Sequence, residues 1–160
     1  MNKAILGTDR VLNWLLRAPN LKIVDLLVWY KENSLGLGSW FRSQAEFAFL
    51  IQKHPTNSKL FKNRSFGNVW VENTLPANQR KHPHQKPREL IKAIIEATTQ
   101  KVDLIVDPCA GSFIVLEVCQ EINREFMGVD LNYWAIREYL QPKKTCGKCQ
   151  QVYQLNKASV

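Results

Sequence analysis

Apolar residues in the first half of the chain follow the β-branched and aromatic pattern that is typical of strands. Such runs predict strands over residues 23–30 and 46–53, and a loop with two glycines separates them. Neighbouring strands joined by such a loop usually pair antiparallel, so we expect a strand pair here. A helix over residues 8–18 is predicted ahead of them, because its apolar residues recur at helical spacing behind a capping threonine.

The second half alternates between helix-like and strand-like segments. Apolar stripes predict helices over residues 87–100, 113–123 and 133–140, and short apolar runs predict strands over residues 102–106 and 125–129. This alternation is typical of a parallel sheet with right-handed crossovers, in which ligands bind at the carboxyl ends of the strands. We therefore predict an α/β fold with a Rossmann-like parallel sheet and an antiparallel strand pair at one edge.

A long basic segment separates the two halves. Residues 54–86 are polar and broken by proline and glycine, which predicts a loop with one short strand at residues 68–71. The net charge is +8, and eight basic against two acidic residues between positions 53 and 89 account for +6 of it. Such a charge favours an acidic partner, nucleic acid first. A solvated basic loop is the alternative, but Phe61, Phe66 and Trp70 among the charges favour phosphate contact.

The size and composition indicate an ordinary globular domain. The chain has 160 residues, of which 45% are hydrophobic and 22% charged. No segment has the apolar core of a signal peptide or the roughly 20 apolar residues of a membrane span, so we expect a cytoplasmic protein without a membrane partner. We predict one domain over residues 1–142 and a tail over residues 143–160.

The tail contains a lone Cys-x-x-Cys pair, Cys146 and Cys149. Structural zinc takes four ligands, and the three histidines are distant in sequence, so no metal site is predicted within this chain. Zinc shared with a second chain, a redox pair and exposed thiols stay open as roles for the pair. The four cysteines have irregular spacing, which does not indicate a disulfide framework.

The strongest chemical signal is the stretch "VDPCAGSF" at residues 106–113. Asp107 ends a predicted strand, and Gly111 and Ser112 offer backbone N–H groups where a helix begins. Asp130 ends the next strand, where a carboxylate can accept hydrogen bonds from ribose hydroxyls. A nucleoside-like cofactor with an anionic or zwitterionic end fits this pattern, while the dinucleotide and P-loop fingerprints are absent. The alternative is a turn whose acids only cap or pair.

These residues resemble a known family. "DPCAGSF" followed by "REFMGVDLN" is similar to the cofactor-binding signatures of the amino-group DNA methyltransferases, which methylate adenine N6 or cytosine N4. "HPHQKP" at residues 82–87 resembles their His-Pro-Thr-Gln-Lys-Pro segment, and "LLVWYKEN" and "EFAFLIQK" resemble two of their strands. The matches span about residues 22–140 in the β-type order of the family's motifs.

The resemblance implies a partial Rossmann-like methyltransferase fold, S-adenosylmethionine (SAM) as cofactor and double-stranded DNA as partner. By this resemblance, the amino-acid end of SAM is bound by Asp107, Pro108, Cys109, Ala110, Gly111, Ser112 and Phe113. Asp130 would bind the ribose, and Gln85, Lys86 and Pro87 would flank the methionine side. The basic residues expected to contact DNA are Lys31, Arg64, Arg80 and Lys81.

Two departures from the family pattern stand out. Phe113 occupies a position where the family usually has glycine, so its ring either crowds the methionine end or points into the core. The catalytic Asp/Asn/Ser-Pro-Pro-aromatic tetrapeptide is absent, because none of the seven prolines is next to another. The tetrapeptide holds the target amino group and stacks on the flipped base, so the catalytic residues and the target base stay unassigned.

Without the tetrapeptide, the chain is expected to be the C-terminal portion of a site-specific methyltransferase. Three explanations stay open: a second chain or homodimer completes the site, the gene is a truncated remnant, or the chain is a non-catalytic nucleic-acid-binding or regulatory module. An incomplete sheet has an unpaired edge, which favours association with a partner.

Overall fold

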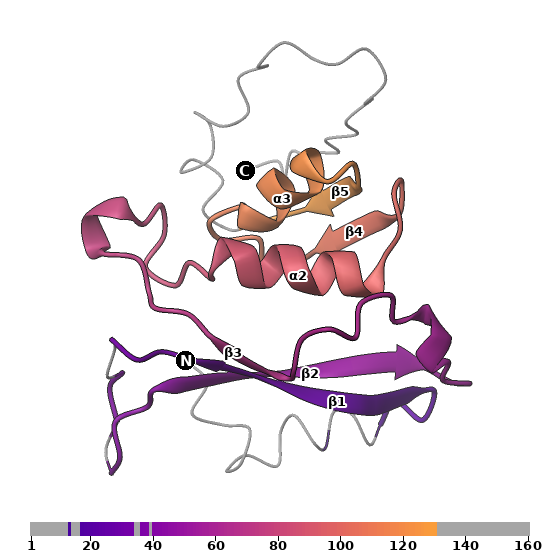
Figure 1. Cartoon of the computed structure of the whole chain (residues 1–160), viewed down its shortest axis with the longest axis horizontal. Helices are drawn as coiled ribbons and strands as arrows, with labels where there is room; N and C mark the ends of the chain where they lie inside the picture. The colour runs from indigo at the N-terminus through magenta and orange to yellow at the C-terminus, as the bar shows by residue number, and fades with distance from the viewer. Residues whose placement is uncertain (1–12, 14–16, 34–35, 39, 131–160) are drawn as a thin grey trace, which may run out of the picture. The chain divides into compact units, whose positions relative to one another are not determined.

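The computed structural model describes residues 13, 17–33, 36–38 and 40–130, and these fall into two compact units, Met1–Leu75 and Pro76–Val160 (Figure 1). The helix predicted over residues 133–140, the Cys146–Cys149 pair and most of the helix predicted over residues 8–18 lie outside the described residues.

The first unit contains a three-stranded sheet in the order β2-β1-β3. Strand β1 (Leu21–Tyr30) pairs antiparallel with β2 (Ala45–Lys53), and the register places Trp29 opposite Glu46. Both strands and their antiparallel pairing were predicted from the sequence and are confirmed. The β-branched and aromatic side chains along β1 suit the pleated surface of a strand, which explains why the pattern was readable.

The third strand of this sheet is short and comes from the basic segment. Strand β3 (Val69–Val71) runs parallel to β1, with Val28 paired to Val69. Asn68 fixes the start of this pairing, since its carbonyl accepts from the Val28 N–H at 2.8 Å and its side-chain amide donates to the Leu26 carbonyl at 3.0 Å. The short strand predicted at residues 68–71 is confirmed. A single 3₁₀ turn, η1 (Ser58–Leu60), interrupts the loop before it.

The second unit alternates helix and strand as the sequence predicts. After a 3₁₀ turn, η2 (Ala77–Gln79), come α2 (Arg88–Thr98), β4 (Leu104–Asp107), α3 (Ile114–Glu121) and β5 (Glu125–Gly128). Strands β4 and β5 pair in parallel, from Leu104 opposite Glu125 to Asp107 opposite Gly128, with α3 as the connection between them. This confirms the parallel pairing. Pro87 lies one residue before α2 as its N-cap, rather than in its first turn.

One apolar core fixes the arrangement of these elements. Helix α2 packs against α3, and α3 packs against β5 (Figure 1). The fully buried centre is Val118 and Cys119 of α3. Ile95 of α2 and Ile122 at the end of α3 are buried beside them, and Ile105 of β4 and Phe126 of β5 pack against this cluster. Burying several aliphatic side chains at about 1.5–3 kcal/mol each holds the carboxyl ends of β4 and β5 in place.

Candidate functional site

The predicted cofactor turn begins where β4 ends. The Asp107 side chain accepts a hydrogen bond from the Cys109 N–H at 3.1 Å, which turns the chain sharply after the strand. Beyond the strands, the Val129 N–H donates to the Asp107 carbonyl at 3.1 Å, and the Ala110 N–H donates to the Val129 carbonyl at 3.0 Å. The turn is therefore fastened to the end of β5, at the edge of the sheet where α/β proteins bind ligands.

Gly111 and Asp130 meet at this edge. Gly111 has a φ of +51°, which is the left-handed region that glycine adopts at little cost. Its N–H donates to the Asp130 carboxylate at 2.8 Å, between residues 19 positions apart. The sequence predicts that the Gly111 N–H is offered to the cofactor and the Asp130 carboxylate to the ribose. In the structure these two groups bind each other, so a ligand here would meet them as one unit.

The packing of the Phe113 side chain explains how a residue other than glycine is accommodated at this position. Its φ is 56°, again in the left-handed region, at a cost of about 1–2 kcal/mol for a residue with a side chain. The ring is buried with Ala110 and Leu116, and its centroid lies 6.1 Å from that of Phe126. Of the two predicted alternatives, the ring packs into the core. Burial of the ring offsets the backbone strain that glycine would avoid.

The segment "HPHQKP" lies beside this turn. A methyl group built on Gly111 would come within 3.8 Å of His82 Nδ1, so the two sequence motifs are neighbours. The segment is itself a closed turn: the Gln85 N–H donates to the His82 carbonyl at 3.0 Å, and the Gln85 side chain accepts from the Lys81 N–H at 2.9 Å. His82 belongs to the motif that resembles the family's segment, and that motif is the sequence signal for its place beside the turn.

His82 also accepts a hydrogen bond within its own turn. Its Nδ1 accepts from the His84 N–H at 3.2 Å, and the two rings lie 5.8 Å apart. This geometry assigns the proton of a neutral His82 ring to Nε2. Gln85 is partly buried and Lys86 is exposed, and Pro87 is buried at the start of α2. The predicted cofactor residues of this segment and of the Asp107–Phe113 turn thus lie on adjoining loops of one unit.

The four predicted DNA contacts have different surroundings. Lys31 is only 8% exposed, pairs with Glu46 at 3.0 Å and lies 5.1 Å from the Trp29 ring centroid. This placement argues against a phosphate contact, because the ammonium already has an anion and a ring as neighbours. Arg64 is exposed, and its guanidinium donates to the Ser58 carbonyl at 2.9 Å.

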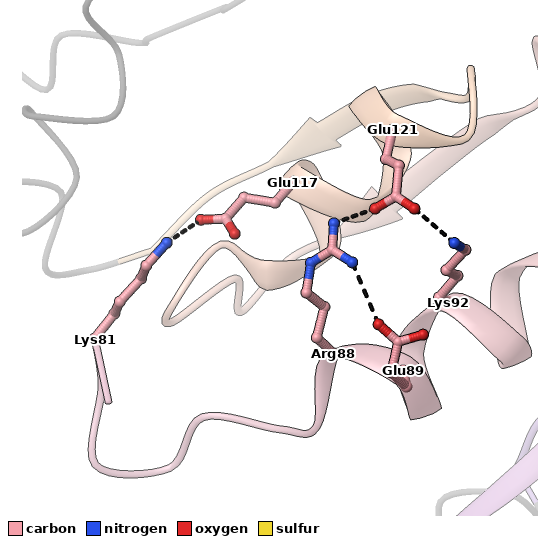
Figure 2. A network of polar contacts seen from close by, with 6 residues as sticks. All are labelled: Lys81, Arg88, Glu89, Lys92, Glu117 and Glu121. Atoms are coloured by element: carbon pink, nitrogen blue, oxygen red, sulfur yellow. Dashed lines mark hydrogen bonds and ion pairs between the residues drawn. The ribbon is translucent and has the colours of Figure 1, made fainter. Parts of the chain in front are cut away.

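In the second unit, Arg80 is partly buried, and its guanidinium is 3.5 Å from the Pro83 carbonyl. Lys81 forms an ion pair with Glu117 at 2.5 Å (Figure 2). Arg64 thus has the surroundings that best suit a phosphate contact among the four.

A second group of charges joins α2 to α3. The Glu121 carboxylate accepts from Lys92 at 2.5 Å and from Arg88, and Arg88 also reaches Glu89 at 3.4 Å (Figure 2). The hydrogen bonds from Lys92 and Arg88 hold the pKa of Glu121 below its ordinary value. The same carboxylate raises the pKa of Lys92 and of Arg88. These groups stabilise the helix pair.

The two cysteines of the described chain differ sharply. Cys109 is exposed in the turn, whereas Cys119 is buried in the core, and burial raises the pKa of its thiol to about 11. Within the described residues, no group of three or more His, Cys, Asp or Glu side chains is arranged to bind a metal. The helices of the described part are all too short or too polar to cross a membrane.

Comparison with known proteins gives the class. The family model described as DNA methylase matches residues 9–141. The Type II methyltransferase M.HhaII of Haemophilus parahaemolyticus is 40% identical over 119 residues, which cover 74% of this chain and 50% of that protein. The Type II methyltransferase M2.DpnII of Streptococcus pneumoniae is 30% identical over 141 residues, which cover 79% of this chain and 51% of that protein.

Solved structures agree on the fold. M1.HpyAVI, solved as a complex with SAM, superposes with a TM-score of 0.63 over 83% of this chain and 71% of its own, at 22% identity. PvuII DNA methyltransferase, described as cytosine-N4-specific, superposes with a TM-score of 0.66 over 85% of this chain and 57% of its own, at 14% identity. The described elements are thus a partial Rossmann-like methyltransferase fold.

The chain belongs to the DNA methylase family. This confirms the resemblance on which the sequence analysis relied. The chain spans about half the length of the curated relatives it matches.

Proposed function

We propose that the chain is the cofactor-binding portion of a site-specific, SAM-dependent DNA methyltransferase that modifies adenine N6 or cytosine N4. The observation that carries the proposal is the contact between the Gly111 N–H and the Asp130 carboxylate at the carboxyl edge of β4 and β5. Membership of the DNA methylase family supports the reaction class. The match across residues 9–141 supports one family domain over residues 1–142.

The residues of the turn suit a zwitterionic nucleoside. Gly111 has no side chain, which permits a ligand to approach its backbone closely, and its N–H already donates to Asp130. Asp130 lies two residues beyond β5, where a carboxylate can accept hydrogen bonds from both ribose hydroxyls. Backbone N–H groups at the start of α3 favour the carboxylate of the amino-acid end. The cofactor residues proposed are Asp107 to Phe113, Asp130, and Gln85 to Pro87.

SAM, when bound, supplies an electrophilic methyl group on a sulfonium centre. The transfer breaks the bond between this carbon and sulfur, forms a bond to the exocyclic nitrogen of the base, and releases one proton from that nitrogen. The chain's own residues would bind and orient the donor and exclude water from it. The proton and the flipped base are not assigned to residues here, because the sequence has no Pro-Pro tetrapeptide.

We further propose that a segment outside these 160 residues, on a second chain, supplies that tetrapeptide. This agrees with the chain's span of about half the length of its relatives. The basic residues between positions 53 and 89 favour a second candidate function, a non-catalytic nucleic-acid-binding or regulatory module, so the experiment must separate the two. Among the described residues, Arg64 and Arg80 are the proposed phosphate contacts on double-stranded DNA.

The test is the transfer of labelled methyl from SAM to double-stranded DNA. The purified 160-residue chain is assayed alone and together with the half of M.HhaII that this chain does not match. Incorporation only in the mixture supports the split enzyme, and Asp107→Ala should abolish it. Incorporation by the chain alone means that it or its homodimer holds the flipped base. DNA binding without turnover in both assays supports the module.

A further inference from the structure

Lys81 and Glu117 form an ion pair between the two proposed cofactor segments. Lys81 directly precedes "HPHQKP", and Glu117 is in the first turn of α3, directly after the Asp107–Phe113 turn. Their side chains point toward each other from the loop and the helix, with 2.5 Å between Nζ and Oε1 (Figure 2). They are 36 positions apart in sequence, so the contact depends on the fold.

Each partner is tied to a cofactor segment through its backbone. The Glu117 N–H donates to the Phe113 carbonyl at 3.2 Å, which fixes it to the end of the turn. The Lys81 N–H donates to the Gln85 side chain at 2.9 Å, so the position of Lys81 sets the orientation of Gln85. His82, the next residue, lies against Gly111. The ion pair is therefore a bridge that fixes the distance between Gln85 and the turn.

We propose that Lys81 and Glu117 are positioning residues that hold the Gln85 loop against the Asp107–Phe113 turn, so that SAM meets both segments already in register. This inference rests on the proposed function. It also replaces the predicted DNA contact of Lys81 with a role inside the cofactor site. A ligand that binds two preorganised loops does not have to order them, and its affinity rises for that reason.

The neighbouring pair Lys92–Glu121 provides a matched control. It has the same chemistry and the same 2.5 Å separation, and Glu121 is one helical turn beyond Glu117 on α3. Lys92 joins α3 to the second turn of α2, whereas Arg88, the other partner of Glu121, directly follows Pro87. Lys92→Met therefore removes the control pair alone. Both pairs are partly exposed, and such pairs add little to global stability. Loss of either pair should leave the protein folded, but only loss of the Lys81–Glu117 pair should loosen the loop that carries Gln85.

The experiment measures SAM affinity by calorimetry for the wild type and for Glu117→Gln, Lys81→Met and Lys92→Met. We expect the dissociation constant to rise about fivefold for Glu117→Gln and for Lys81→Met, and to stay within about twofold for Lys92→Met. The double variant of Lys81 and Glu117 should be no weaker than either single variant, because both remove one interaction. The exchanged pair Lys81→Glu with Glu117→Lys should recover most of the affinity.

Hydrogen exchange without SAM is the second readout. The Gln85 N–H should exchange faster in Glu117→Gln than in Lys92→Met, which a general loss of stability would not produce. Equal SAM affinity and equal exchange in these two variants would overturn the positioning role while leaving the proposed function intact. A folded wild type that binds no SAM would overturn the proposed function itself. A loss of DNA affinity for Lys81→Met alone would return Lys81 to a phosphate contact and overturn the bridge.

Discussion

The backbone N–H of Gly111 donates to the carboxylate of Asp130 at 2.8 Å, and this bond joins the first turn after β4 to the end of β5. This bond orders the turn together with the bond from the Cys109 N–H to Asp107, and it involves the acid that is proposed to bind the ribose. A hydrogen bond to a carboxylate is stronger than one between neutral groups. The shape of the proposed cofactor site therefore depends in part on the Asp130 side chain.

Asp130→Asn should weaken SAM binding about tenfold or more, because the charge-assisted hydrogen bond and the proposed ribose acceptor are both changed. Asp103→Asn is the matched control, since Asp103 also accepts a backbone N–H, that of Gln100 at 2.8 Å, at the opposite end of β4. Calorimetric titration with SAM measures both variants. Equal affinities for the two would remove Asp130 from the site.

At position 113, glycine should be less destabilising than alanine, which is the reverse of the usual order of these two substitutions. Phe113→Ala and Phe113→Gly both lose the buried ring and should lower the free energy of unfolding by about 2–5 kcal/mol. Glycine should be the milder change by about 1 kcal/mol, because the φ of 56° costs it little. Leu116, buried in the interior of α3, is the control, and there alanine should be the milder change. Urea unfolding of the four variants gives the two rankings, and the same order at both positions would contradict the account.

Cys109 and Cys119 should react very differently with iodoacetamide at pH 8. Cys109 is exposed and should be alkylated readily, while Cys119 is buried and its thiol pKa is raised to about 11, so it should react only after unfolding. Saturating SAM should slow the alkylation of Cys109 at least severalfold, because this residue lies in the proposed site. Peptide mass spectrometry reports each residue separately. Unchanged labelling of Cys109 by a SAM-bound protein would place the cofactor elsewhere.

The Glu121 network should make stability depend on acid pH. The pKa of Glu121 is lowered from its ordinary value of 4.5, so its contribution is present above that pH and is lost as the pH falls through the lowered value. The pKa of Lys92 is raised, so its contribution to stability is retained until the pH exceeds the ordinary value of 10.5. The difference in unfolding free energy between the wild type and Glu121→Gln should therefore be constant from about pH 6 to 9 and shrink below 4.5. A difference that persists undiminished at pH 3 would show that the carboxylate charge is not the cause.

Substitution of Lys31 should change only the stability of the protein, and substitution of Arg64 should change only its DNA affinity. Lys31→Met breaks the pair with Glu46 and should cost about 1 kcal/mol of stability without changing DNA affinity. Arg64→Ala should leave the stability unchanged, weaken DNA binding and reduce the salt dependence of the affinity by about one charge. Fluorescence anisotropy at several salt concentrations measures the second effect. A loss of DNA affinity for Lys31→Met without a loss of stability would restore the prediction that Lys31 contacts DNA.

The elements were predictable where local sequence decides them. β-branched and aromatic residues marked β1 and β2, and the alternation of apolar runs marked β4, α3 and β5 with their parallel pairing. The left-handed backbone of Phe113 was not readable, because the side chain type gave no sign that core packing would offset its strain. The contacts of Lys31 with Glu46 and of Lys81 with Glu117 depend on strand register and on the path of a loop. Charge composition cannot distinguish such pairs from free basic residues.

The most direct test of the central claim is a calorimetric titration of the purified, folded 160-residue chain with SAM. The account predicts binding with one site per chain, weakened by Asp130→Asn and unchanged by Asp103→Asn. A folded chain that binds no SAM, or that binds it equally well without the Asp130 carboxylate, would contradict it.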